Sequence, residues 1–382
     1  MIHTVWPYLA LMLLIAGTFP MLERRFGWRV FSVMPPIVMV YLTVTALSVS
    51  GLWHIDGDIQ AAQKTLIAQV IPAMLFLLMI NCDLRAIFAL GPRVLAVFFS
   101  TTLCLFVAFT TTYLIFRNVL PETGWAPLAA LSGSWVGGSA NLIAVKEAVG
   151  MSDNALAMAL LTDALCYSVW VAVLFSLAKA APAFNRWTNA KASGEIIAAV
   201  PTATGPITPD SVLLWLGMAL AAGTGSRALA GMLPESMYLS NTSWTIIFAT
   251  IAGLVVAHTP IAKFPGASRI ASGLLIFVVA ILASQSNFQG IASAPWYIAC
   301  GLSILAIHAI LLALMAKAFR FDLHLCGISS LAHVGGVAAT PVLAAAYSPA
   351  LVPVGILLAL LGYILGTGFG LLMASVLSSL AP

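Results

Sequence analysis

Long apolar segments, separated by short polar stretches, recur along the whole chain. In the first half they lie at about 5–20, 32–51, 65–81, 93–116, 125–149 and 154–178. In the second half they lie at about 211–232, 241–257, 270–285, 296–316, 324–347 and 351–378. A helix needs roughly 20 apolar residues to cross the hydrocarbon layer of a membrane, and most of these segments approach or exceed that length. The pattern therefore predicts an all-α polytopic membrane protein.

The composition strengthens this prediction. Hydrophobic residues make up 62% of the 382 residues, and charged residues only 7%. Soluble domains carry about 25% charge, and a fold of this size could not bury so much apolar surface. No Lys or Arg precedes the first segment and no A-x-A cleavage motif follows it, so we expect a retained span rather than a signal peptide. The five cysteines form no C-x-x-C pair, which favours buried inert thiols.

The two sets of segments resemble each other. The fifth segment of each set carries the pattern S-x-x-[WH]-V-G-G, at residues 132–138 and again at residues 330–336, about half of the chain apart. An internal duplication explains this order. We therefore expect an N-terminal transmembrane repeat over 1–180, a polar linker over 181–210 and a C-terminal repeat over 211–382.

The positions of Lys and Arg distinguish two topologies. If all twelve segments cross the membrane, the two sides collect seven and nine basic residues, which is no bias. If both fifth segments are re-entrant hairpins, the inner side collects twelve and the outer side keeps four: Lys64, Arg117, Lys146 and Arg227. The positive-inside rule favours the second topology. Each half then crosses five times, so the repeats are inverted relative to each other. A single broken crossing helix in place of each hairpin is the alternative.

The glycine pairs Gly137–Gly138 and Gly335–Gly336 are expected to interrupt their helices. Unwound backbone at membrane depth is tolerated only where protein or a polar cavity satisfies its N–H and C=O groups, and glycine supplies the conformational freedom. Thr340-Pro341 after the second pair is typical of a helix start, and Ser139 or Asn141 can cap in the first copy. The alternative is that paired glycines only let helices pack closely.

Two helix N-termini that converge from opposite faces would make a site favourable to an anion, with carbonyl groups nearby for a cation. Secondary transporters build their solute sites in this way. The residues predicted to bind solute are Ser132, Ser134, Gly137, Gly138, Ser139, Asn141, His333, Gly335, Gly336 and Thr340.

One acidic residue, Asp163, lies near the middle of an apolar segment, NALAMALLTDALCYSVWVAVLF. An unpaired charge at that depth costs at least about 2.5–3.5 kcal/mol, so Asp163 is a candidate sodium ligand or proton carrier. The predicted ion-coupling residues are Asp163, Thr162, Asn141 and Thr340. A structural carboxyl group is the alternative. Apart from a possible sodium ion, we expect no metal and no cofactor.

Other polar residues allow two interpretations. His333 replaces Trp135 beside the second glycine pair, where it could bind solute or a proton, or be a neutral core histidine. Lys146 and Glu147 are expected near the outer surface, and His308 is expected to be structural.

No G-x-S-x-G, H-E-x-x-H, Walker A or dinucleotide motif occurs, so we do not expect an enzyme. The sequence GTGFG at residues 366–370 lies in an apolar segment. Together with Tyr363, these small residues predict that the last helix packs closely against a hairpin.

Nearly the full length of the chain resembles a bacterial and plastid membrane-protein family, domain of unknown function 819. The most specific parts are GSWVGGSANLIAVKEAVGMSDNALAMALLTDALCYSVW and HVGGVAATPVLAAAYSPALVPVGILLALLGYILGTGFG. By similarity, that family is grouped with the cation/proton antiporter and anion transporter superfamily, which includes sodium/glutamate, citrate-type and bile-acid-type symporters. The resemblance implies inverted repeats, a mobile core domain with the broken helices or hairpins, a scaffold that dimerises, and elevator-like alternating access. Asp163 has no adjacent Asp or Asn, unlike the paired acids of sodium/proton antiporters.

These observations predict a sodium- or proton-coupled secondary transporter of a small organic solute, anionic or zwitterionic. Cation/proton exchange is the alternative within transport, and a membrane-embedded enzyme or a sensor without transport is the alternative from another class. The expected partners are the lipid bilayer, the solute and a second copy in a homodimer, with no nucleic acid. The expected location is the bacterial inner membrane.

Overall fold

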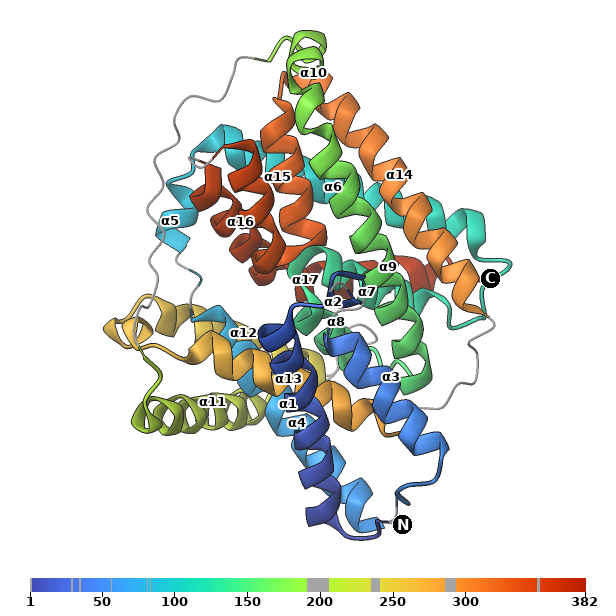
Figure 1. Cartoon of the computed structure of the whole chain (residues 1–382), viewed down its shortest axis with the longest axis vertical. Coiled ribbons are helices and arrows are strands. Elements are labelled where there is room, and N and C mark those ends of the chain that lie inside the picture. Colours follow the sequence, from blue (N-terminus) through green and yellow to red (C-terminus); the bar gives the residue numbers. More distant parts are fainter. Residues whose placement is uncertain are drawn as a thin grey trace. The chain divides into compact units, whose positions relative to one another are not determined.

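The computed structural model describes residues 2–28, 30–33, 36–55, 57–80, 82, 84–190, 206–234, 241–285, 293–348 and 351–382. These residues form helices and short connections, with one isolated bridge between Ile2 and Trp53 (Figure 1). Seven of the helices are long and apolar enough to cross a membrane. The prediction of an all-α polytopic membrane protein is confirmed.

The helices follow the same order in the two halves of the chain. The first half contains α1 (Val5–Phe26), α2 (Val30–Val33), α3 (Pro36–Val49), α4 (Gly57–Met79), α5 (Leu84–Phe88), α6 (Pro92–Phe116), α7 (Trp125–Gly137), α8 (Ser139–Ala148) and α9 (Asp153–Leu177). The second contains α11 (Pro209–Ala230), α12 (Asn241–Ala257), η2 (Pro260–Lys263), α13 (Ala267–Ala283), α14 (Ala294–Phe319), α15 (Leu323–Val334), α16 (Gly336–Tyr347) and α17 (Val352–Ser379). In each half, a helix pair interrupted at glycine precedes the last long helix. This order is what a duplication would produce.

Between the halves, η1 (Ala178–Ala180) and α10 (Ala181–Thr188) continue from α9. The expected polar linker therefore begins as a helix. Residues 191–205 of the predicted linker lie outside the described residues, and its last two residues, Pro209 and Asp210, begin α11. The inverted relation of the repeats stays a prediction.

Local sequence explains where several helices begin and end. Gly27 ends α1 with a left-handed φ of 57°, and its N–H donates to the Glu23 carbonyl. Thr208 and Ser211 form a capping box at the start of α11, with Pro209 in the first turn. Asp322 accepts from the Leu325 N–H at 3.1 Å and so caps α15.

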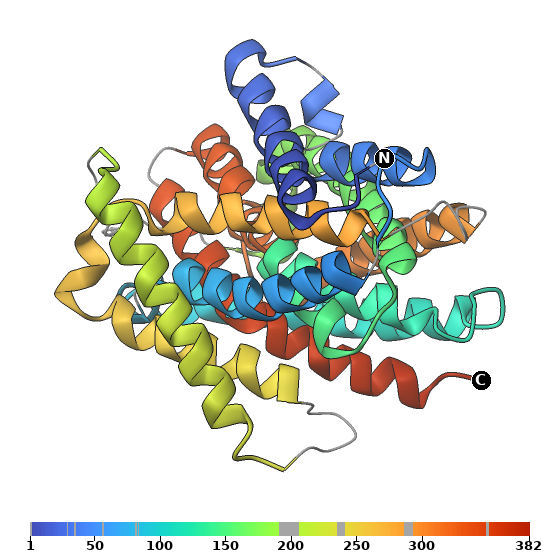
Figure 2. The same ribbon diagram turned by 90° about the horizontal axis from the view of Figure 1, so that it is seen from below.

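The chain divides into two compact units, and each draws segments from both halves. Unit 1 comprises Met1–Asn81, Lys146–Ala164 and Ala203–Ala294, and unit 2 comprises Cys82–Val145, Leu165–Thr202 and Pro295–Pro382. In unit 1, α4 packs against α11, α12 and α13, and α1 and α3 pack against α13. Figure 2 shows α11, in yellow-green, lying across α4 and α13. The units therefore interleave the two halves instead of separating them.

In unit 2, α17 is the helix on which the others assemble. It packs against α7, α15, α16 and α6. Glycines on α17 allow the closest of these approaches: a Cβ on Gly370 would lie 3.2 Å from the Gly133 Cα, and one on Gly366 would lie 2.5 Å from the Gly137 Cα. This confirms the prediction that the last helix packs closely against a hairpin. The packing positions the candidate site.

Candidate functional site

Both glycine pairs interrupt the helix that contains them. In the first, α7 ends at Gly137 and α8 begins at Ser139, with Gly138 between them at a φ of 81°. In the second, α15 ends at Val334 and α16 begins at Gly336, whose φ is 61°. L-residues with a side chain rarely adopt these backbone conformations. Glycine is therefore required at Gly138 and Gly336 for the breaks to form.

The arms of the first interrupted helix fold back on each other. Gly133, before the break, lies against residues after it: a Cβ on Gly133 would be 3.0 Å from the Val145 side chain and 3.3 Å from the Asn141 carbonyl oxygen. A broken helix that continued in one direction would separate these residues. We call this α7–α8 pair hairpin 1.

The second interrupted helix is also a hairpin, named hairpin 2 here. The rings of His324 on α15 and Tyr347 on α16 stack at a centroid distance of 4.7 Å. A Cβ on Gly327 would lie 2.8 Å from the Tyr347 hydroxyl oxygen. Figure 1 shows α15 and α16 side by side. Of the two alternatives left by the sequence, both segments follow the hairpin.

The turns of the two hairpins meet at Tyr363 on α17. A Cβ on Gly138 would lie 2.8 Å from the Tyr363 Cε1 atom, and a Cβ on Gly336 would lie 3.5 Å from the same atom. The preceding residue, Gly362, lets α17 approach both hairpins, because its missing side chain would meet the carbonyl oxygens of Val136 and Ala332. Sequence analysis did not assign Tyr363 to the site. Only the packing around α17 identifies it.

Asn141 connects hairpin 1 to α17. Its Nδ2 donates to the Gly137 carbonyl and, at 3.4 Å, to the Tyr363 carbonyl. Its Oδ1 accepts a hydrogen bond from the Thr367 hydroxyl. Asn141 and Thr367 are 2% and 5% exposed, so these bonds form in a buried environment. Thr367 is a second site residue that sequence analysis missed.

The predicted N-caps are wrong in both hairpins. The Gly138 carbonyl accepts the first helical hydrogen bond of α8, from the Asn141 N–H at 2.9 Å, so Ser139 and Asn141 both lie inside the helix. Thr340 also lies inside α16, where its hydroxyl donates to the Gly336 carbonyl at 2.6 Å. The physical reason is that a glycine with positive φ can turn the chain and start the next helix at once. No capping side chain is then needed.

His333 is fully buried and bonded at both ring nitrogens. Nδ1 lies 2.8 Å from the Ser329 carbonyl oxygen and Nε2 lies 2.8 Å from the Thr102 hydroxyl. A carbonyl only accepts, so Nδ1 carries a proton, and in the neutral ring Nε2 accepts from the Thr102 hydroxyl, whose other acceptor within reach is the Phe98 carbonyl at 3.1 Å. The Phe98 ring lies 4.3 Å away, centroid to centroid. These contacts are those of a neutral core histidine that holds α15 against α6.

The serines of the repeated pattern make local or bracing contacts. Ser132 donates to the Ala129 carbonyl at 2.7 Å, and the Ser134 carbonyl accepts from the Gly138 N–H. In the second copy, the Ser330 hydroxyl lies 2.9 Å from both the Trp170 Nε1 and the His308 Nε2. His308 thus has a structural contact, as expected. Gly335 is the last residue before the second turn, with an α-helical φ of −109° and ψ of −11°.

The four predicted ion-coupling residues are divided between the units. Asn141 and Thr340 belong to unit 2, whereas Thr162 and Asp163 belong to unit 1. Asp163 is half-buried in α9, which is one of the candidate membrane spans. Thr162 is 1% exposed, and its hydroxyl has no hydrogen-bond partner in the described part of the chain. Thr162 and Asp163 thus supply adjacent oxygen atoms within one span.

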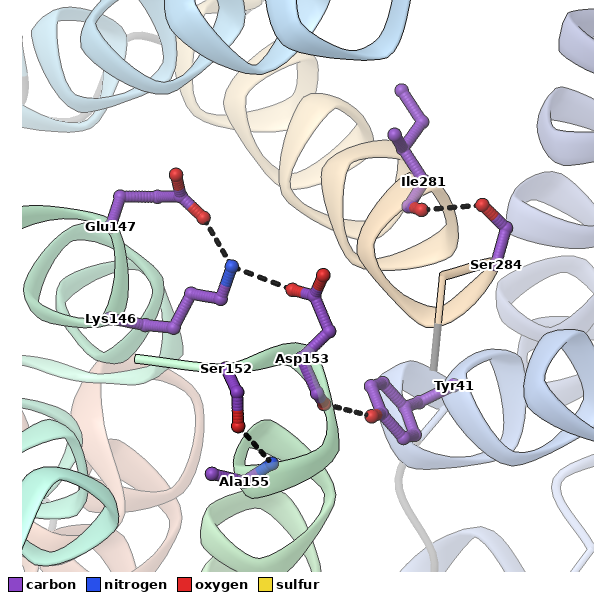
Figure 3. A network of polar contacts seen from close by, with 8 residues as sticks. All are labelled: Tyr41, Lys146, Glu147, Ser152, Asp153, Ala155, Ile281 and Ser284. Atoms are coloured by element: carbon purple, nitrogen blue, oxygen red, sulfur yellow. Dashed lines mark hydrogen bonds and ion pairs between the residues drawn. The ribbon is translucent and has the colours of Figure 1, made fainter. Parts of the chain in front are cut away.

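A buried ion-pair cluster in unit 1 was not foreseen. Lys146 is 6% exposed, and its Nζ lies 2.5 Å from Glu147 Oε1 and 2.6 Å from Asp153 Oδ1 (Figure 3). The Tyr41 hydroxyl donates to the Asp153 carbonyl at 2.5 Å. Burial acts to lower the pKa of Lys146, but the two carboxylates more than offset this and the pKa is raised. Its side chain is buried because the turn at Gly150 brings Asp153 over it, and the position of Lys146 near the outer surface of the membrane stays a prediction.

Comparison with known proteins identifies the family. No curated protein matches the chain in sequence. The profile of DUF819, described as a protein of unknown function, matches residues 10–380. This match covers both hairpins and all of the candidate spans, apart from the first few residues of α1. The chain therefore belongs to the DUF819 family, as the resemblance of its diglycine segments predicted.

Proposed function

We propose that the chain is a secondary active transporter of a small organic solute, anionic or zwitterionic, driven by a sodium or proton gradient. The observation that carries the proposal is that the breaks of two helical hairpins meet at one side chain, Tyr363, in a chain whose described residues include seven candidate membrane spans. Interrupted helices are costly at membrane depth, where no water satisfies their backbone. Their occurrence twice, at one place, favours a binding role.

The chemistry at the breaks suits an anionic group. The first N–H groups of α8 and α16 have no partner within their own helices, and the positive ends of both helix dipoles lie there. The Asn141 amide and the Thr367 hydroxyl donate to protein oxygens and hold hairpin 1 against α17 beside the first break. A solute carboxylate can accept hydrogen bonds from the first N–H groups of the two helices. Thr162 and Asp163 would carry the coupling ion, because they offer oxygen atoms inside a candidate span.

The division into units supports an elevator-like mechanism. Hairpin 1 as far as Val145, hairpin 2 and α17 lie in unit 2, while α1, α3, α4 and α11 to α13 lie in unit 1. In this proposal unit 2 carries the solute, and unit 1 is the scaffold, which holds the coupling ion at Thr162 and Asp163 and through which two copies form a homodimer. The location proposed is the bacterial inner membrane, and the chain would act by transport rather than by catalysis.

Reconstitution into proteoliposomes tests the proposal. Uptake of labelled organic acids and amino acids is measured with a sodium gradient and a pH gradient imposed separately. We expect one gradient to drive accumulation, and the Asp163→Asn variant to lose that accumulation while keeping its thermal stability. Coupled uptake at the wild-type rate in this variant would remove Asp163 from the coupling role. Absence of uptake under both gradients across the panel would contradict symport.

Cation/proton exchange is the second candidate, since Thr162 and Asp163 alone could bind a cation or a proton. The same vesicles separate the two functions. With a pH-sensitive dye inside and no organic solute present, an exchanger would move protons when sodium or potassium is added outside. A solute symporter would not respond until its solute is supplied.

A further inference from the structure

A cavity of about 290 Å³ lies beside the Lys146 cluster in unit 1. Its wall is formed by α4, α11 and α12, together with the end of α8, the start of α9 and the end of α13. All of its lining residues belong to unit 1. Pockets for drug-sized ligands measure about 300–1,000 Å³, so this one suits a smaller molecule.

The cavity wall carries an excess of positive charge. Lys64, Lys146 and Arg227 line it, against the two carboxylates Glu147 and Asp153. Both carboxylates pair with Lys146. Arg227 donates to the Ala68 carbonyl, and within the described ranges neither Arg227 nor Lys64 is paired with a carboxylate. A ligand carboxylate would supply the missing negative charge, and a guanidinium group can bind it through two parallel hydrogen bonds.

The same wall can also accept a cationic group. The side chains of Glu147 and Asp153 are 21% and 20% exposed, whereas that of Lys146 is 8% exposed. A carboxylate has about four acceptor positions, so each can bind a ligand ammonium group and keep its contact with Lys146. The remaining lining is largely apolar and includes Ile67, Ile71, Pro72, Ile246 and Leu282.

We propose that this cavity binds a small α-amino acid with an apolar side chain. Its carboxylate would lie on Arg227 and Lys64, its ammonium group on Glu147 and Asp153, and its side chain against the apolar wall. A zwitterion satisfies charges of both signs at once, which an organic acid or an amine alone does not. The inference goes beyond the proposed transport, because equilibrium binding here needs neither an ion gradient nor the glycine turns of the hairpins.

The test compares three probes with one carbon skeleton. L-Leucine carries both charges, α-ketoisocaproate lacks the ammonium group, and isoamylamine lacks the carboxylate. Titration calorimetry on the full chain in lipid nanodiscs should show saturable binding of L-leucine, at least about tenfold tighter than either analogue, because each analogue lacks one charge-assisted contact. If α-ketoisocaproate bound as tightly as L-leucine, the proposed preference for a zwitterion would be wrong. If L-leucine showed no saturable binding, the proposed amino-acid site would be wrong.

Variants locate the binding within the molecule. Arg227→Gln and Lys64→Gln should each weaken L-leucine binding, by about tenfold for the arginine. Lys64 is exposed, so its variant tests the site without disturbing the core. Arg25→Gln is the matched control, since Arg25 is exposed in the same unit and lies outside this cavity. Unchanged affinity in both cavity variants would place the binding elsewhere. Intact binding in a chain that fails to transport would contradict the transport proposal alone.

Discussion

Replacing Gly138 by alanine tests the contact between hairpin 1 and Tyr363. Two separate costs are expected. The residue has a φ of 81° and a ψ of 171°, a conformation adopted almost only by glycine, and holding a residue with a Cβ there costs roughly 1–3 kcal/mol. The new Cβ would also lie 2.8 Å from Tyr363 Cε1, well inside the roughly 3.5–4.0 Å of a normal carbon contact. Overpacking of this kind costs about 1–3 kcal/mol. The expected total is about 2–6 kcal/mol.

Two other glycines separate these costs. Gly27 has a left-handed backbone, with a φ of 57° and a ψ of 32°, and no atom lies within 4 Å of its added Cβ, so G27A should show the cost of a left-handed backbone without a steric contact. Gly336 has a φ of 61° and would meet Tyr363 only at 3.5 Å, an ordinary contact, so G336A should resemble G27A. The measurement is the free energy of unfolding in mixed micelles for the three variants, with the wild type as reference.

A double substitution then assigns the steric part to Tyr363. In a G138A/Y363L chain the ring is absent, so the two changes should be less costly together than the sum of their separate costs. The backbone cost should remain. If G138A were no more destabilising than G336A, or if the double variant were additive, the ring would not lie against the first break. The shared meeting point of the hairpins would then be wrong.

Two further predictions concern buried polar groups. Because the pKa of Lys146 is raised, the stability from its ion pairs is present below the unfolded value of 10.5 and is lost as the pH rises through the higher folded value. The stability difference between wild type and K146M, measured by micelle unfolding, should therefore shrink above about pH 10.5, and a difference independent of pH would contradict a charged Lys146. Thr102→Val removes the partner of the His333 Nε2 and should cost about 1–3 kcal/mol, whereas Thr102→Ser should be nearly neutral. Equal unfolding energies for the two variants would show that the hydroxyl does not serve His333.

The sequence by itself determined the features that depend on local chemistry. The lengths of the apolar segments predicted the helices, because burial of backbone polar groups in lipid leaves few other structures. Gly138 and Gly336 predicted the breaks, because the required φ is available to glycine and to few other residues. The repeated pattern around them predicted the similar order of helices in the two halves, and the diglycine segments predicted the family.

Only the tertiary structure decided which residues meet. Asn141 was assigned to the correct turn, but its predicted capping role was wrong. Its side chain instead bonds to Thr367 and Tyr363, and these partners come from a helix more than two hundred residues away in the sequence. Lys146 is buried because the chain turns at Gly150 and brings Asp153 onto it. Contacts of this kind depend on which helices pack together. Membrane helices associate through close van der Waals fit and hydrogen bonds between side chains of different helices, so the residue pattern of one helix does not select its partner.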